Sequence, residues 1–258
     1  MSTRQTGLRV GLFVAAGILI QGAAQAQSTF RLYAGVAPTA YKISFDGSSP
    51  YPNQTAKSQY TAANVGLTWI SPKGIYVDVS GQQSLSATHD LWNSVTSQSQ
   101  DFSHDSYTLT GGYVHGFSQG ASISGFGGYL KSTTTLNAPR PPFLFSQDKF
   151  DSKGIFVGVG GGIPALGGQV TASGAIAFMS GRWTDDKVSN AYSNKADYTF
   201  GYSLGAAYTY KFTQAWGVTG DLRYQRYNYN FDVYSITEPA FQVSEKILSA
   251  GVRLSYQF

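Results

Sequence analysis

Residues 197–212 alternate strictly between two kinds of side chain, and this alternation restricts the fold more than any other feature of the sequence. The even positions carry Tyr198, Phe200, Tyr202, Leu204, Ala206, Tyr208, Tyr210 and Phe212. The odd positions carry Asp197, Thr199, Gly201, Ser203, Gly205, Ala207, Thr209 and Lys211. A period of two residues predicts a β-strand with one apolar face and one face of small or polar side chains.

The same alternation recurs along the chain and divides it into about ten strands. Short turns are expected at residues 71–74, 118–120, 164–168 and 213–216, and longer polar segments at about 47–56, 86–104, 132–150, 181–196 and 232–240. Short and long connections that alternate are typical of an up-and-down antiparallel meander. We therefore predict an all-β, transmembrane up-and-down β-barrel of about ten strands. Eight or twelve strands remain open because segments such as 30–46 alternate weakly.

The composition indicates which face of the barrel is apolar. Charged residues make up 12% of the chain, about half the usual share of a soluble domain, while aromatic residues reach 15%. Apolar faces turned inward would overfill a small barrel and leave an outer surface with little charge. Apolar faces turned outward would contact lipid, and closure would leave no unpaired backbone edge in the bilayer.

The length of the strands agrees with this orientation. Sixteen tilted residues rise roughly 40 Å, which exceeds the apolar band of such barrels, about 25 Å. We expect one aromatic belt at the turn end, from Tyr208, Tyr210, Phe212 and Trp216, and a second at the loop end that includes Tyr198.

The first 26 residues have the layout of a secretory signal peptide. Arg4 and Arg9 precede an apolar run at residues 10–20, and the sequence Ala24-Gln25-Ala26 follows as a cleavage site. We expect one domain, the barrel, at residues 27–258. Loss of the two arginines lowers the formal charge from +4 to +2, too little to favour nucleic acid. The chain has no cysteine, so disulfides and thiol chemistry are excluded.

The last residues, GVRLSYQF, place Val252, Leu254, Tyr256 and Phe258 on one face. This pattern resembles the carboxy-terminal signature of Gram-negative outer-membrane β-barrel proteins, of the porin-family or opacity-protein kind. The resemblance implies residence in the outer membrane, contact with its lipid and lipopolysaccharide, and assembly by the barrel-assembly machinery. It does not define a function, because adhesins, enzymes, narrow channels and structural barrels share it.

Charged residues at inward positions are the candidates for a lumen site. We expect Asp78, Lys211, Asp221, Arg223 and Arg253 to point inward, where they would line a pore or pair with one another and plug it. We favour the plug, since barrels near eight strands are filled by side chains.

The third long segment offers a candidate for surface interaction. Arg140 lies between stiff prolines and precedes Phe143, Leu144 and Phe145. These apolar residues would bind an extracellular ligand, or would fold onto the rim of the barrel or the outer-leaflet lipids.

The histidines were weighed as catalytic residues. His89-Asp90 and His104-Asp105 flank the second long segment and could activate water, as a His/carboxylate pair does. The strand count is similar to that of the omptin proteases, but their paired aspartates and Asp/His couple are not found, so we favour polar loop residues. His115 is expected at the membrane interface. No cofactor or metal site is predicted.

These features predict a non-enzymatic barrel whose surface loops mediate adhesion, host interaction or envelope integrity. A narrow passive porin for small solutes is the second hypothesis, and a surface hydrolase is the third.

Overall fold

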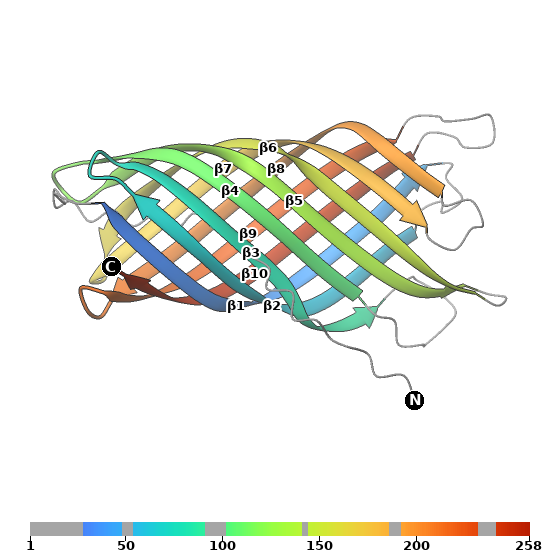
Figure 1. Cartoon of the computed structure of the whole chain (residues 1–258), viewed down its shortest axis with the longest axis horizontal. Coiled ribbons are helices and arrows are strands. Elements are labelled where there is room, and N and C mark those ends of the chain that lie inside the picture. The colour runs from blue at the N-terminus through green and yellow to red at the C-terminus, as the bar shows by residue number, and fades with distance from the viewer. Residues whose placement is uncertain (1–27, 48–53, 91–101, 141–143, 186–191, 232–240) are drawn as a thin grey trace.

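The computed structural model describes residues 28–47, 54–90, 102–140, 144–185, 192–231 and 241–258. They form a single closed barrel of antiparallel strands, in which each strand pairs with its neighbours in sequence and β1 pairs with β10 (Figure 1). The ten strands are β1 (Thr29–Gly47), β2 (Gln54–Ile70), β3 (Ile75–Asp90), β4 (Phe102–Gly116), β5 (Ser122–Arg140), β6 (Leu144–Ala165), β7 (Gly168–Asp185), β8 (Tyr192–Lys211), β9 (Trp216–Phe231) and β10 (Phe241–Gln257). The predicted fold class and strand number are confirmed.

The first and last strands close the barrel along most of their length. Their register runs from Arg31 opposite Gln257 to Gly47 opposite Phe241. At the very end, the backbone amides of Phe30 and Phe258 donate to each other's carbonyl oxygens over 3.0 and 2.9 Å. Closure satisfies the backbone groups that an open sheet would expose along both edges.

The two ends of the barrel differ in their connections. Short turns join the strands at one end, where Phe258 also lies, and we call it the turn end; it is on the left in Figure 1. At the turn between β6 and β7, Leu166 and Gly167 have φ angles of 50° and 75°. Two consecutive positive φ angles define the type I′ hairpin turn, which matches the twist of the flanking strands. The opposite end, which carries the longer connections, is the loop end.

Among the described residues, no helix is long and apolar enough to cross a membrane.

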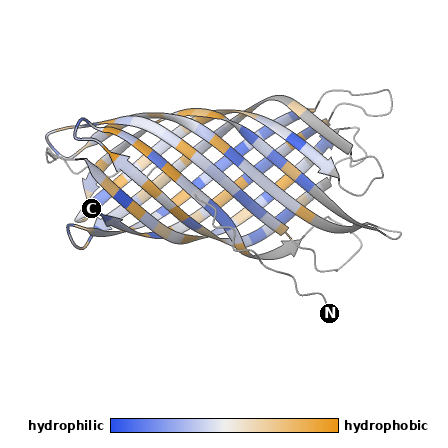
Figure 2. Ribbon diagram, viewed as in Figure 1, coloured by the Kyte–Doolittle hydropathy of each residue, from blue (hydrophilic) through white to orange (hydrophobic). Residues whose placement is uncertain are grey.

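The outer face of the barrel carries the apolar residues, as predicted. On β10, Leu248, Val252, Leu254 and Tyr256 are all more than one third exposed, whereas Arg253 between them is buried. Figure 2 shows the resulting alternation of hydrophobic and hydrophilic positions along the strands. Inward-facing and outward-facing residues therefore follow the period of two that the sequence displays.

The apolar face forms a band of the height expected for a membrane barrel. On β1 the outward residues from Phe30 to Ala40 are apolar, and Lys42 is the first charged one. Ten residue steps of about 3.3 Å, inclined by about 40°, rise about 25 Å. Tyr210 and Trp216 are exposed near the turn end of this band, and Phe200 is exposed near its loop end. The side chain of Tyr198 is outside the described set.

The strands continue well beyond this band at the loop end, which corrects the loop boundaries expected from sequence. Residues 132–150 were expected to form a loop, yet β5 runs to Arg140 and β6 begins at Leu144, with these two residues opposite each other. Beyond the band the outer face of a strand no longer contacts lipid, so the run of outward apolar residues ends while backbone pairing continues. His89, Asp90, His104 and Asp105 likewise lie in strands β3 and β4.

The strict alternation expected over 197–212 breaks near its start. The register between β8 and β9 shifts between Asp197 and Phe200, and Ala196 and Thr199 are both buried. A β-bulge of this kind re-aims the residues on one side of it.

Candidate functional site

The lumen is divided into three layers along the barrel axis. A cluster of charged and polar side chains lies at the turn end beside a small apolar cluster of Tyr76 and Val114. A cavity with mixed polar and apolar walls lies in the middle, and a cluster of aromatic and aliphatic side chains fills the loop end. We call the charged cluster, the cavity and the loop-end cluster the ionic cluster, the chamber and the plug, respectively.

An ion pair between two neighbouring strands forms the centre of the ionic cluster. Arg253 on β10 donates from Nη2 to Oδ1 of Asp221 on β9 over 2.9 Å, and both side chains are largely buried. The guanidinium of Arg253 also lies over the ring of Tyr33, 5.5 Å from its centroid. Burying a charge is costly unless a partner of opposite charge offsets it, so these contacts hold Arg253 and Asp221 as a unit.

Asp78 forms the second part of the ionic cluster. Its carboxylate accepts hydrogen bonds from the hydroxyls of Tyr33, over 3.2 and 3.3 Å, and of Thr68. Arg31 in turn donates to the Thr68 hydroxyl over 3.4 Å. Tyr33 contacts both Asp78 and Arg253, so the carboxylate of β3 and the ion pair of β9 and β10 belong to one polar network.

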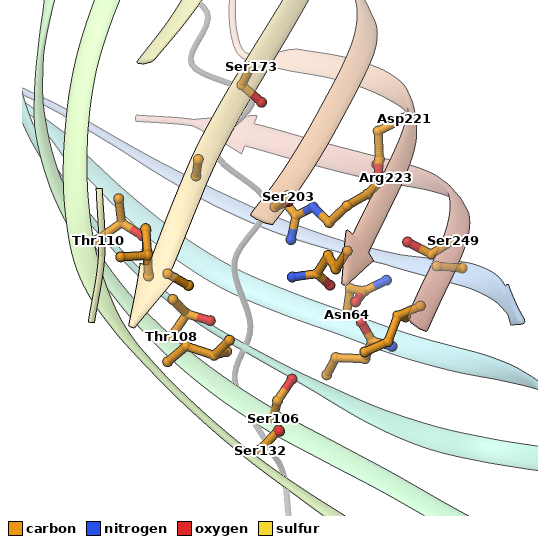
Figure 3. A pocket seen from close by; sticks show the side chains of 18 of the residues that line it. Asn64, Ser106, Thr108, Thr110, Ser132, Ser173, Ser203, Asp221, Arg223 and Ser249 are labelled. Carbon is orange, nitrogen blue, oxygen red and sulfur yellow. The ribbon is translucent and has the colours of Figure 1, made fainter. Parts of the chain in front are cut away.

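The remaining predicted lumen cations also point inward. Lys211 lies nearest the turn end and donates to Oε1 of Gln257 over 3.0 Å. Arg223 lies further along β9 than Asp221, among the residues that line the chamber (Figure 3). All five predicted lumen residues therefore face the lumen, and both carboxylates among them have polar partners there.

The chamber is a cavity of about 120 Å³ with room for several water molecules. Its walls combine apolar side chains such as Phe126 and Leu130 with small hydroxyl-bearing ones, and Asp221 and Arg223 lie on one side (Figure 3). These hydroxyl residues are Ser106, Thr108, Thr110, Ser132, Ser173, Ser203 and Ser249. Small residues on the inner face leave this space because their side chains do not reach the barrel axis.

The plug closes the chamber toward the loop end. Its largest fully buried side chains include Phe150, Tyr229, Phe231, Ile43 and Met179, which come from four different strands. The rings of Phe150 and Tyr229 meet edge to face with centroids 4.8 Å apart, a favoured aromatic geometry. These side chains pack against one another across the interior of the loop end.

A polar network runs through the plug. The Glu245 carboxylate is fully buried and accepts hydrogen bonds from Tyr41 over 2.8 Å and from Tyr229 over 3.2 Å. The Tyr41 hydroxyl also lies 3.2 Å from the Thr134 hydroxyl, which lies 2.8 Å from Nδ1 of His104. Five side chains from five strands are thus joined, which fixes the plug in one arrangement.

The sequence analysis favoured a lumen plugged by paired charges and did not predict this aromatic plug. The prediction assigned aromatics to the outer face, whereas Tyr41, Tyr227 and Tyr229 are buried inside the barrel. Counting every second residue along β9 from the inward Asp221 and Arg223 places Tyr227 and Tyr229 on the inner face as well. The sequence therefore contained the signal for these two inward tyrosines. Glu245 and Arg31 could have been found in the same way from Arg253 and Tyr33.

The structure places His104 and Asp105 on opposite faces of β4, and the side chains of His89 and Asp90 are outside the described set. His104 is buried in the lumen between the rings of Tyr41 and Tyr60, while its neighbour Asp105 takes the outward position on β4. The expectation that His104 is a polar loop residue is wrong, because its strand continues through this position. His115 faces outward near the turn end and meets Phe117 edge to face at 4.9 Å.

The predicted loop residues are only partly described. Arg140 ends β5, Leu144 begins β6, and Phe145 on β6 lies opposite Pro139. Phe143 is outside the described residues. In the segments that the structure describes, no group of three or more His, Cys, Asp or Glu could hold a metal ion.

Together, the closed antiparallel barrel, the outward apolar band and the filled lumen define the chain as a small β-barrel of the outer-membrane type. No family model and no curated protein sequence matches the chain. Among solved structures it is similar to the outer membrane protease OmpT of Escherichia coli, with 10% identity, a TM-score of 0.62, and coverage of 90% of this chain and 97% of that one. It is also similar to the translocator domain of the autotransporter NalP from Neisseria meningitidis, with 11% identity, a TM-score of 0.53, and coverage of 92% and 91%. These similarities concern the fold.

Proposed function

We propose that the protein is an outer-membrane barrel with a closed lumen, which acts as a non-enzymatic surface scaffold. The turn end would lie in the periplasm, and the loop end would mediate adhesion, host interaction or envelope integrity. The observation that carries this proposal is the plug, in which side chains from several strands pack across the lumen with Glu245 held by two tyrosines.

The physical reason for a closed lumen is the cost of opening it. A continuous water path would require the packed rings around Tyr41, Phe150 and Tyr229 to separate and lose their mutual contacts. Burial of one such aromatic side chain contributes on the order of 2 kcal/mol. Several rings would have to move together, so the closed state is expected to dominate.

Conductance in planar bilayers tests this part of the proposal. The refolded barrel, checked by its heat-modifiable gel migration, is expected to give no discrete current steps. A double variant, Tyr41→Ala with Tyr229→Ala, removes two rings beside Glu245 and should produce steps that favour cations. The matched control, Tyr202→Ala with Tyr224→Ala, removes two rings that lie 5.9 Å apart on the outer face and should stay silent. Steady steps from the unaltered protein would contradict the closed lumen.

A narrow passive channel is the second candidate, and the chamber favours it. The walls of the cavity carry several hydroxyls together with Arg223 and Asp221 among apolar side chains, and these polar groups could bind a small polar solute. Uptake into proteoliposomes distinguishes the two candidates. Entry of small sugars or amino acids through the unaltered barrel would favour the channel, and exclusion of both would favour the scaffold.

The surface role is tested at the β5–β6 hairpin. Replacement of residues 137–147 by a two-residue turn shortens this hairpin and leaves the apolar band intact. We expect cells that display the variant to bind less to host matrix or host cells. An equal shortening between β7 and β8 is the matched control for general damage to the barrel. Unchanged binding in both variants would argue against adhesion by the loop end.

A further inference from the structure

Four basic side chains lie in direct register on four adjacent strands. Lys42 on β1 is opposite Lys57 on β2 and, on its other side, opposite Lys246 on β10. Lys246 is in turn opposite Arg226 on β9. We call these four residues the cationic row. Residues directly opposite each other in an antiparallel sheet have Cβ atoms about 5 Å apart.

The cationic row faces outward. Lys42 lies between the buried residues Tyr41 and Ile43, and Lys246 lies between the buried residues Glu245 and Ile247. Since successive side chains of a strand point to opposite faces, both lysines are on the outer surface. The same argument places Arg226, which precedes buried Tyr227, on that surface.

The row lies at the loop-end boundary of the apolar band. From the turn end toward the loop end, Lys42 is the next outward residue after the apolar Pro38 and Ala40 of β1. In the same direction along β10, which runs antiparallel, Lys246 is the next outward residue after Leu248. Arg226 follows Tyr224 in the same way on β9, and Lys57 lies two outward positions beyond the polar residue Thr61. Three of the four cations are thus the first charged side chains beyond the band, at the depth of lipid head groups.

Such a row is unfavourable without an anion. Like charges directly opposite each other destabilise a sheet, and here three such pairs are consecutive. Among the side chains that the structure describes, no carboxylate forms an ion pair with any of the four; the position opposite Lys57 on β3 is Asp90, whose side chain is outside the described set. The buried Nε of Arg226 has no hydrogen-bond partner there either. The structure provides the donors and the positive charge of an anion site.

We propose that the cationic row binds the phosphate groups of a phosphorylated glycolipid in the leaflet at the loop end. Phosphates offset the repulsion and accept hydrogen bonds from several cations at once. The apolar residues below the row, Leu248 and Tyr224, contact the acyl chains of the same lipid. This inference rests on the membrane location in the proposed function, but it is independent of whether the lumen is closed.

Lys246→Gln provides the sharpest test, because Lys246 has a cation on both sides. In uncharged detergent the variant should melt at a higher temperature than the unaltered barrel, since two repulsive contacts are lost. With lipid A, which carries two phosphates, the variant should bind about fivefold more weakly, as expected for one cation near a charged lipid surface. If Lys246 affected barrel stability alone, the variant would not combine a higher melting temperature with weaker binding of lipid A.

Binding is measured by native mass spectrometry and by melting temperature, with three probes: lipid A, its dephosphorylated form and inorganic phosphate. The triple variant Lys42→Gln, Lys246→Gln, Arg226→Gln should bind lipid A about a hundredfold more weakly. Lys73→Gln removes the same charge from a turn-end connection and is the control expected to bind normally.

Three results would overturn the proposal. Equal binding of lipid A by the triple variant would show that the row is not the site. Equal binding of the dephosphorylated lipid would show that acyl chains alone are recognised. A stabilisation by inorganic phosphate as large as that by lipid A would indicate a free-anion site. The presence or absence of conductance steps has no bearing on these three results. The proposal of a closed lumen and the proposal of a lipid site can therefore be refuted independently.

Discussion

At the scale of single residues, Glu245 combines a carboxylate with an apolar environment. Its two oxygens accept hydrogen bonds from Tyr41 and Tyr229, and these hydroxyls replace part of the hydration that burial removes. A buried polar group left without its partner costs more than the hydrogen bond contributes, because desolvation is then uncompensated. The tyrosine rings thus pack the plug, while their hydroxyls satisfy the carboxylate.

Tyr41→Phe should therefore destabilise the barrel by about 1–3 kcal/mol, because it leaves one oxygen of Glu245 without its donor. Tyr60→Phe is the matched control. Tyr60 is also buried in the plug, but its hydroxyl has no hydrogen-bond partner among the described residues, so we expect a change below about 1 kcal/mol. Urea unfolding in detergent micelles, followed by tryptophan fluorescence, measures both values. Equal losses in the two variants would mean that ring packing, not the carboxylate, dominates.

The residue scale also shows what the sequence could predict about the site. Period-two counting assigns Asp78, Asp221 and Arg253 to the lumen, because that assignment depends only on which face is apolar. It does not say which inward residues meet, since contacts across a lumen join strands that are distant in sequence. The link between Glu245 on β10 and Tyr41 on β1 depends on barrel closure, and periodicity carries no such information.

At the scale of strands, inward glycines provide room for aromatic rings on the neighbouring strand. Gly112 is opposite Tyr76, Gly128 is opposite Phe156, and Gly201 is opposite Tyr227. A methyl group at any of these glycines would overlap the ring across from it. The bare backbone of one strand thus provides the surface on which the ring of the next strand lies.

Gly201→Ala should destabilise the barrel by about 1–3 kcal/mol, because the added methyl group displaces the Tyr227 ring from the plug. Gly220→Ala, on the outer face of β9, is the control: a methyl group there meets nothing within 4 Å and should cost little. The temperature at which heat-modifiable gel migration is lost measures the stability of both variants. A control as unstable as Gly201→Ala would contradict the packing argument.

Strand ends were the least predictable part of the fold. β5 and β6 continue to Arg140 and Leu144, through a stretch rich in threonine and asparagine that has no apolar face. The run of outward apolar residues arises from contact with lipid, so it ends where the strand leaves the membrane. Cross-strand pairing needs no such contact and persists.

At the scale of the whole molecule, closure depends on two strands at opposite ends of the sequence. Thr29–Gly47 and Phe241–Gln257 form one seam, and Phe30 and Phe258 lock its turn end through paired backbone bonds. The rings of these two phenylalanines also stack with centroids 5.8 Å apart. Every other strand pair is joined by a single connection, so this seam has the largest loop to close.

A disulfide across the seam tests closure directly, because the chain has no cysteine of its own. Ser44 and Ser244 are opposite each other, so Ser44→Cys with Ser244→Cys should form an intramolecular disulfide after mild oxidation. The boiled, non-reduced protein should then migrate faster on a gel than the reduced one. Ser44→Cys with Ser249→Cys, whose positions are out of register, should form no such link. An absent link in the first pair would contradict the closed register.

The unequal ends of the barrel also affect its orientation in the membrane. The turn end carries connections as short as Leu166-Gly167 beside an apolar wall, whereas the loop end carries long polar strand extensions and the cationic row. Passage of the loop end through hydrocarbon would require charged side chains such as Lys42 and Lys246 to lose their water. Insertion from the periplasm carries the loop end across the bilayer once, and the same desolvation cost then opposes its return, so the barrel itself retains the orientation in which it was inserted.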